Sequence, residues 1–220
     1  MKAPITCRAV AALLVLVAAS SPRVGRAQDS HKPASLSPAE IEALYSARQD
    51  SARMRFTEAD VGFVTGMISH HAQALVMSEL APSHGARPSV QTLAARIINA
   101  QRDEIALMQR WLEDRGQPVP PVANGEHEHH MPGMLTQEQL EELASAFGPE
   151  FDRLFLTYMI QHHAGAVTMV HDLFTTDGAG QDGAVFKLAS DVQVDQITEI
   201  DRMELMLAAM TGPAGQDAGP

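Results

Sequence analysis

Two copies of one short pattern, a pair of adjacent histidines flanked by methionines, constrain this chain more than any other feature. In each copy a methionine stands three positions before the first histidine and another seven positions after it. The copies contain Met67, His70, His71 and Met77, and then Met159, His162, His163 and Met169. At about 100° per residue, the members of one copy fall largely on one face of an α-helix.

The repeat extends well beyond the histidines. Around them, Asp60 and Phe63 match Asp152 and Phe155 at the same constant offset. A second pair of segments matches at a slightly larger offset, in which Gln101, Glu104, Met108 and Leu112 correspond to Gln196, Glu199, Met203 and Leu207. The chain is therefore a duplicated helical hairpin, which predicts an all-α fold built as a four-helix bundle.

Apolar periodicity and start signals place the helices. Thr57 is a predicted cap for a helix ending near Leu80, and Ser89 for a helix ending near Asp114. The second hairpin is expected over 149–174 and 184–210. A short helix is expected from Ser37 to Arg53, and another follows Thr136 within the crossover. Asp60 and Asp152 lie in first turns, where a capping role is favoured.

The expected domain organisation begins with a secretory signal peptide at 1–27. Lys2 and Arg8 precede a short apolar run, and Gly25-Arg26-Ala27 offers a cleavage site. Cleavage near Ser20 and a retained amphipathic anchor are the alternatives. Residues 28–56 form a tail and short helix, and 57–212 the bundle. The bundle divides into a first hairpin (57–115), a linker with a short helix (116–148) and a second hairpin (149–212). Residues 213–220 form a disordered tail.

Charge and cysteine content limit the function. The formal net charge is −11, which disfavours nucleic acid and anionic lipid as partners. The single cysteine, Cys7, precedes the apolar run and would leave with the signal. An exported, periplasmic or extracellular protein without cysteine has neither disulfides nor thiolate ligands, and no integral membrane anchor is expected after cleavage. Any soft metal ligand must be a methionine sulfur.

Histidine nitrogen combined with methionine thioether suits copper, as Cu(I) or Cu(II), although other transition metals also bind imidazole. Adjacent helical histidines point about 100° apart, so one of each pair is expected to ligate. The other would bind a second ion or a carboxylate, for which Glu104 and Glu199 are candidates, or these glutamates ligate themselves. The candidate metal residues on the helices are His70, His71, His162, His163, Met67, Met77, Met159, Met169, Glu104 and Glu199. Core filling is the alternative for the methionines.

The crossover carries a second set of candidate metal ligands. His127, His129, His130, Met131 and Met134 lie within a few positions of one another and could capture or shuttle an ion. A solvated spacer is the alternative reading.

The doubled pattern Asp-x2-Phe-x3-Met-x2-His-His-x5-Met, with Met131-Pro132-Gly133-Met134 and the Gln101, Glu104, Met108 series, resembles the domain of unknown function 305 family. The resemblance covers roughly Asp60 to Leu207. It implies a ferritin-like bundle in exported bacterial proteins, some of which are linked to periplasmic copper binding. By this resemblance the histidine pairs and flanking methionines are the ligands.

Three functions remain open at this point. The first is copper sequestration or transfer, alone or with a copper-handling protein, without catalysis. The second is a ferritin-like di-metal oxidoreductase, which usually needs Glu-x-x-His on the helices, whereas here only Glu126 to His129 of the linker has that spacing. The third is a pH-responsive structural or partner-binding bundle. Binding is favoured over catalysis, and a homo-oligomer is left open.

Overall fold

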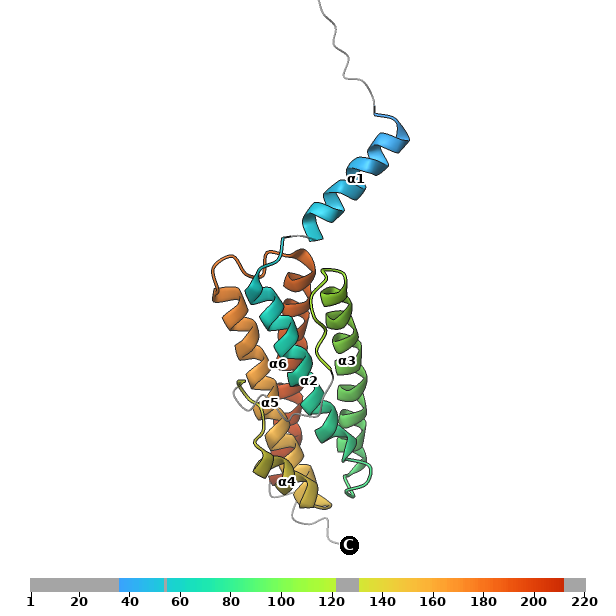
Figure 1. Ribbon diagram of the computed structural model, residues 1–220. Helices are drawn as coiled ribbons and strands as arrows, with labels where there is room; N and C mark the ends of the chain where they lie inside the picture. The colour runs from blue at the N-terminus through green and yellow to red at the C-terminus, as the bar shows by residue number, and fades with distance from the viewer. Residues whose placement is uncertain (1–35, 54, 122–130, 212–220) are drawn as a thin grey trace, which may run out of the picture.

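The computed structural model describes residues 36–53, 55–121 and 131–211 of the chain. These residues form six helices and no strand: α1 (Pro38–Arg53), α2 (Glu58–Glu79), α3 (Pro88–Glu113), α4 (Gln137–Ser145), α5 (Pro149–Thr175) and α6 (Gly183–Thr211). The four long helices α2, α3, α5 and α6 lie side by side as a bundle (Figure 1). The predicted all-α fold, a bundle with short extra helices, is confirmed.

Local side-chain chemistry fixes where several helices begin. Thr57 and Asp60 form a capping box at the start of α2, in which each side chain binds the backbone N–H of the other residue. Thr136 and Gln139 do the same for α4. The predicted caps at these two helices, and the capping role of Asp60, are confirmed.

The predicted cap of the third helix is wrong by two residues. Arg87, not Ser89, is the N-cap of α3, and its side chain makes no capping hydrogen bond. Pro88 takes the first helical position instead. A proline there has no N–H to satisfy and already holds a helical φ, so it starts the helix before the serine can cap it.

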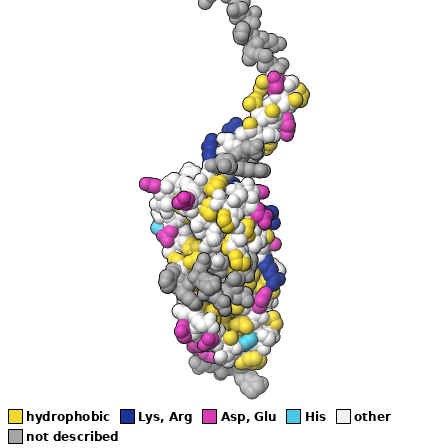
Figure 2. Space-filling view, viewed as in Figure 1, with side chains coloured by type: hydrophobic (Ala, Val, Ile, Leu, Met, Phe, Trp, Pro, Cys, Tyr) yellow, Lys and Arg dark blue, Asp and Glu magenta, His cyan; other side chains and the backbone are white. Residues whose placement is uncertain are grey.

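The packing follows the duplication. α2 packs on α3 and α5 packs on α6, and the two hairpins meet mainly where α2 contacts α5. α1 projects from one end of the bundle, and α4 lies at the other end (Figure 1). Every described side chain from 36 to 48 is exposed, and apolar side chains are visible along α1 in Figure 2.

The apolar core is divided into two clusters. One contains Met77, Phe151 and Met203, from the end of the bundle near α4. The other contains Phe63, Trp111 and Val185, from the end near α1. Along each long helix, buried polar residues separate the members of the two clusters. A polar layer therefore crosses the middle of the bundle.

Two buried aspartates join the hairpins reciprocally. Asp60 of α2 accepts a hydrogen bond from the backbone N–H of Gly180, in the loop between α5 and α6. Asp152 of α5 accepts from the backbone N–H and the guanidinium of Arg87, at the end of the loop between α2 and α3. Asp152 therefore holds the opposite loop. Its predicted capping role is wrong, because Gly148 is the N-cap of α5 and no side chain caps that helix. Each hairpin fixes the loop of the other, so the polar layer between them has a defined register.

Candidate metal centre

The polar layer consists of six side chains from all four bundle helices, and each of them is at most 3% exposed. They are His70, His71, Gln101, His162, His163 and Gln196. The four histidines are fully buried. The predicted convergence of the two histidine pairs is therefore observed, since the layer brings both pairs into the bundle interior.

The second histidine of each pair contacts a carboxylate on the partner helix of its own hairpin. His71 Nε2 lies 2.6 Å from Glu104 Oε2, and His163 Nε2 lies 2.7 Å from Glu199 Oε2. Both glutamate side chains reach the outer part of the bundle, with 13% and 19% exposure. These contacts match the predicted role of the glutamates as carboxylate partners of the histidines.

The first histidine of each pair contacts a backbone carbonyl. His162 Nε2 lies 3.0 Å from the carbonyl oxygen of His70, and His70 Nε2 lies 3.1 Å from that of Pro132. The rings of His70 and His162 are 3.9 Å apart between centroids, with planes inclined by 39°. The two hairpins thus meet at these two rings.

These contacts determine the tautomers of the histidines. A carbonyl or carboxylate oxygen only accepts hydrogen bonds, so Nε2 carries the proton in each ring. Burial lowers the pKa of His70 to about 3, with a further contribution from His71, and burial with the charge of His70 lowers the pKa of His162 well below 6.5. These two rings are neutral at pH 7. A neutral ring protonated at Nε2 has an unshared electron pair on Nδ1.

None of the four Nδ1 atoms has a hydrogen-bond partner among the described residues. Buried polar atoms are rarely left in this state, because each costs free energy unless a partner compensates it. The neutral rings of His70 and His162 each have an available electron pair on Nδ1, and neutral imidazole nitrogen is a common metal ligand. The residues present therefore fit a metal ion.

Acidic side chains lie outside the histidines. Partial burial raises the pKa of Asp195 on α6, and the neighbouring carboxylates of Glu104 and Glu199 raise it further. A cation approaching the histidine layer from this side would pass through a negative potential.

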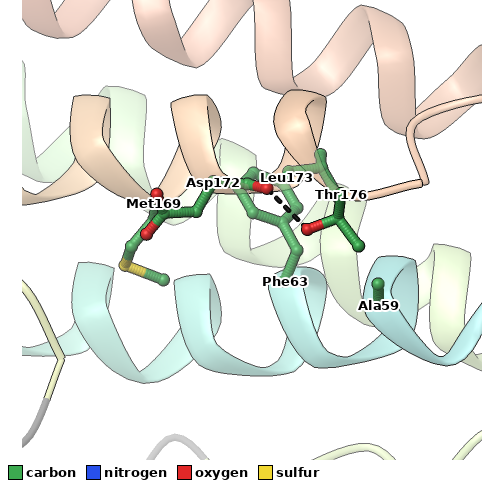
Figure 3. A pocket seen from close by; sticks show the side chains of 6 residues that line it. All are labelled: Ala59, Phe63, Met169, Asp172, Leu173 and Thr176. Carbon is green, nitrogen blue, oxygen red and sulfur yellow. Dashed lines mark hydrogen bonds between the residues drawn. The ribbon is translucent and has the colours of Figure 1, made fainter.

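The predicted methionine ligands occupy different environments. Met67, Met77 and Met159 are fully buried within the two apolar clusters. Met169 is only partly buried and lines a depression of about 220 Å³ between α2 and α5 (Figure 3). Phe63 and Leu173 form its apolar wall, beside Ala59, Asp172 and Thr176. No contact between a methionine sulfur and the polar layer is observed among residues 36–53, 55–121 and 131–211, so ligation by these methionines stays a prediction.

The crossover meets the bundle next to the histidines. A Cβ added to Gly66 would lie 3.3 Å from Met131 Sδ and 3.4 Å from Met169 Cε, so both thioether side chains pack over that glycine. Met134 is buried. The other crossover candidates, His127, His129 and His130, lie outside the described residues.

Two members of the layer were not among the candidate metal residues. Within the part of the chain that the structure describes, neither amide atom of Gln101 has a hydrogen-bond partner, and nor does Oε1 of Gln196. Both glutamines were visible in the sequence as repeated polar residues on helix faces that also carry apolar side chains. The carbonyl of Pro132 was also missed, because a backbone contact leaves no side-chain pattern.

Among the described residues, no three or more His, Cys, Asp or Glu side chains are arranged to hold one metal ion. Also within those residues, no helix combines the length and apolar character needed to span a bilayer.

The family model for the domain of unknown function DUF305 matches residues 60–207. The chain belongs to the DUF305 family. The match spans both hairpins and the crossover, and so contains the whole polar layer. A search of curated proteins finds no match.

Solved structures of DUF305 proteins resemble this one. A fragment from Deinococcus radiodurans is 32% identical with a TM-score of 0.61, covering 70% of this chain and 97% of the other. A DUF305 protein of Streptomyces coelicolor, named as a candidate secreted protein, is 28% identical with a TM-score of 0.59, over 68% and 92%. CopM in its Cu(I)-bound form is 32% identical with a TM-score of 0.55, over 70% and 98%. CopM has also been solved with Cu(II) and with Ag.

Proposed function

We propose that this protein binds monovalent copper in the polar layer and sequesters or transfers it. The observation that carries the proposal is the set of four buried Nδ1 atoms without hydrogen-bond partners. Each belongs to a ring whose Nε2 is already held by an oxygen acceptor. Two or more of these atoms would bind the ion, while the Nε2 contacts keep the rings oriented.

The donor set favours Cu(I) over Cu(II). Cu(I) accepts as few as two neutral nitrogen donors, whereas Cu(II) prefers a tetragonal set of nitrogen and oxygen ligands. Burying a single positive charge also costs less than burying two. Glu104 and Glu199, bound to His71 and His163, supply compensating negative charge from outside the layer. The likeness to CopM, solved with Cu(I), with Cu(II) and with Ag, supports copper as the metal in either oxidation state.

We further propose that the protein acts outside the cytoplasm, in the periplasm or extracellularly, as the signal-like residues 1–27 indicate. The naming of the Streptomyces coelicolor relative as a candidate secreted protein supports this proposal. In an oxidising compartment, a site of histidines without thiolates is not lost to disulfide formation. A copper-handling protein would be the partner in transfer.

Competitive titration tests the proposal. The purified protein is titrated with Cu(I), and separately with Ag(I), against a chelator of known affinity. We expect saturable binding that is lost when His70, His71, His162 and His163 are all changed to alanine. His171→Ala is the control, because His171 is exposed on α5 outside the layer. Equal Cu(I) affinity for the wild type and the quadruple variant would refute the proposal.

A di-metal oxidoreductase is less well supported. Such centres use carboxylates that bridge two ions, whereas Glu104 and Glu199 each face a different histidine. In the same titration, we expect the protein to bind Cu(I) without turning over oxygen or peroxide.

A further inference from the structure

The crossover segment packs tightly against α5 at Gly165. A Cβ added to Gly165 would lie 2.0 Å from the carbonyl oxygen of Pro132 and 2.5 Å from Cα of Gly133. Real Cβ atoms do not approach other atoms so closely, so no other residue fits at 165 without moving the crossover. Gly165 lies in the middle of a 27-residue helix, where glycine is unfavourable, and this close approach explains its presence.

The same carbonyl reaches the polar layer. Pro132 O, packed against Gly165, also accepts the hydrogen bond from His70 Nε2 at 3.1 Å. The Nε2 atoms of the other three histidines face acceptors on bundle helices, namely Glu104, Glu199 and the carbonyl of His70. Only His70 depends on an acceptor from the crossover. This contact distinguishes the two histidine pairs, which the duplication would otherwise make equivalent.

A second contact holds the crossover in place. The side chain of Gln73, one turn after His70 on α2, donates to the carbonyl of Leu135 and accepts from its backbone N–H. Gln73 is 2% exposed and Leu135 is fully buried. The crossover is therefore fixed on α5 by close packing at Pro132, and on α2 by the paired hydrogen bond at Leu135. Together these two contacts hold the Pro132 carbonyl next to His70.

We propose that the Pro132 carbonyl, packed against Gly165, is a positioning group that keeps His70 in the Nε2–H tautomer and so keeps His70 Nδ1 free for the metal ion. The proposal rests on the proposed function. In the other tautomer, the proton on Nδ1 would block ligation, and the electron pair on Nε2 would face the carbonyl oxygen. If the crossover were displaced, His70 would lose its preference for the Nε2–H tautomer, and the other three histidines would keep theirs.

The test measures tautomers directly in the metal-free protein. Long-range ¹H–¹⁵N correlation spectra distinguish protonated from bare ring nitrogens for each assigned histidine. The variants are Gly165→Ala, which displaces Pro132, and Gln73→Ala, which releases Leu135 without adding bulk. Gly62→Ala is the matched control, because an added Cβ there has nothing within 4 Å. The amide chemical shift of Gly133, the residue after Pro132, reports whether the crossover has moved.

In the wild type and in Gly62→Ala, we expect His70 to be protonated only at Nε2. In Gly165→Ala and Gln73→Ala, we expect a mixture of tautomers at His70, unchanged spectra for His71 and His163, and at least a tenfold loss of Cu(I) affinity. If Gly165→Ala does not fold, Gln73→Ala decides the question. An Nδ1–H tautomer in the wild type would overturn the proposal. So would an unchanged His70 in a variant whose Gly133 amide shift shows that the crossover has moved.

The two proposals fail separately. If the wild type does not bind Cu(I), the proposed function is wrong, whatever the spectra show. If the wild type binds Cu(I) but displacing the crossover leaves the His70 tautomer and the affinity unchanged, only the role of Pro132 is wrong.

Discussion

The Nε2–H of His162 donates to the backbone carbonyl of His70, the residue that occupies the equivalent position in the other half of the duplication. The reverse contact is not made, because His70 donates to Pro132. The two halves of the site are therefore related but not equivalent. Experiments on the layer should accordingly treat each histidine separately.

Removing the charge of the glutamates should weaken metal binding. Glu104→Gln and Glu199→Gln each keep an oxygen acceptor near Nε2 but remove the negative charge that makes the histidine a stronger donor. We expect Cu(I) affinity to fall by roughly 10- to 100-fold for each variant, as for other changes to partners of metal-binding histidines. Chelator competition measures this effect. Glu113→Gln, exposed on α3, is the control, and an equal loss in that variant would contradict a specific role.

Acid should destabilise the metal-free protein. Burial lowers the pKa of His70 to about 3 and that of His162 well below 6.5, whereas both histidines titrate near about 6.5 in the unfolded chain. Below that pH, the unfolded chain binds protons that the folded protein excludes. The contribution of these two rings to stability should therefore be constant above about pH 6.5. It should fall below that pH by up to roughly 1.4 kcal/mol per pH unit for each ring.

Urea denaturation at pH 7, 6 and 5 measures this dependence. Replacing both rings, as in His70→Gln with His162→Gln, should remove most of the slope between pH 6.5 and 5. Saturating Ag(I) should raise stability at every pH where it binds the folded protein more tightly than the unfolded chain. A metal-free protein equally stable at pH 7 and pH 5 would show that these rings are not held neutral.

The amide of Gln101 should lower the stability of the metal-free protein. Its amide is 1% exposed and has no hydrogen-bond partner, which costs free energy in the folded state. Gln101→Leu should therefore stabilise the metal-free protein by about 1 kcal/mol or more in thermal or urea denaturation. Gln73→Leu is the contrasting variant. Its amide makes two buried hydrogen bonds, so the same exchange should be destabilising. Destabilisation by both variants would contradict the interpretation of Gln101.

The reciprocal aspartates should each hold the opposite loop. Asp60→Ala leaves the Gly180 N–H without its acceptor, and Asp152→Ala does the same to the Arg87 N–H. Each should cost roughly 1–3 kcal/mol of stability. Hydrogen exchange should speed up at Gly180 in the first variant and at Arg87 in the second. Asp103→Ala, at an exposed position on α3, should change neither rate, and loosening confined to the mutated hairpin would contradict the reciprocal contact.

Much of this architecture can be predicted because its determinants are local or repeated. The capping box of Thr57 and Asp60 is formed by residues three positions apart, and the duplication identifies the four long helices. The repeated Glu104 and Glu199 could be proposed as partners of the histidines, because helix periodicity places them on one face. At Pro88, two local signals compete within three residues, and the proline prevails.

What could not be predicted depends on contacts between backbone and side chains far apart in sequence. Which nitrogen of His70 is free follows from a carbonyl 62 positions away, and no residue type at that position reveals it. Gly165 was a usable signal, because a glycine inside a long helix indicates close approach of another element. The separate environments of Met169, which is partly buried, and Met77, which is fully buried, also depend on packing, since the two methionines occupy equivalent positions in the two copies.

The contacts of Asp60 and Asp152 also bear on how such a chain could arise. Each hairpin carries both parts of the contact. It has an aspartate at the start of its first helix, and the loop between its two helices has a backbone N–H that can donate. Two identical hairpins would complete both contacts across a subunit interface, as a symmetric dimer. Gene fusion of such a dimer would keep both histidine pairs, and the crossover would be the part that joins the two hairpins.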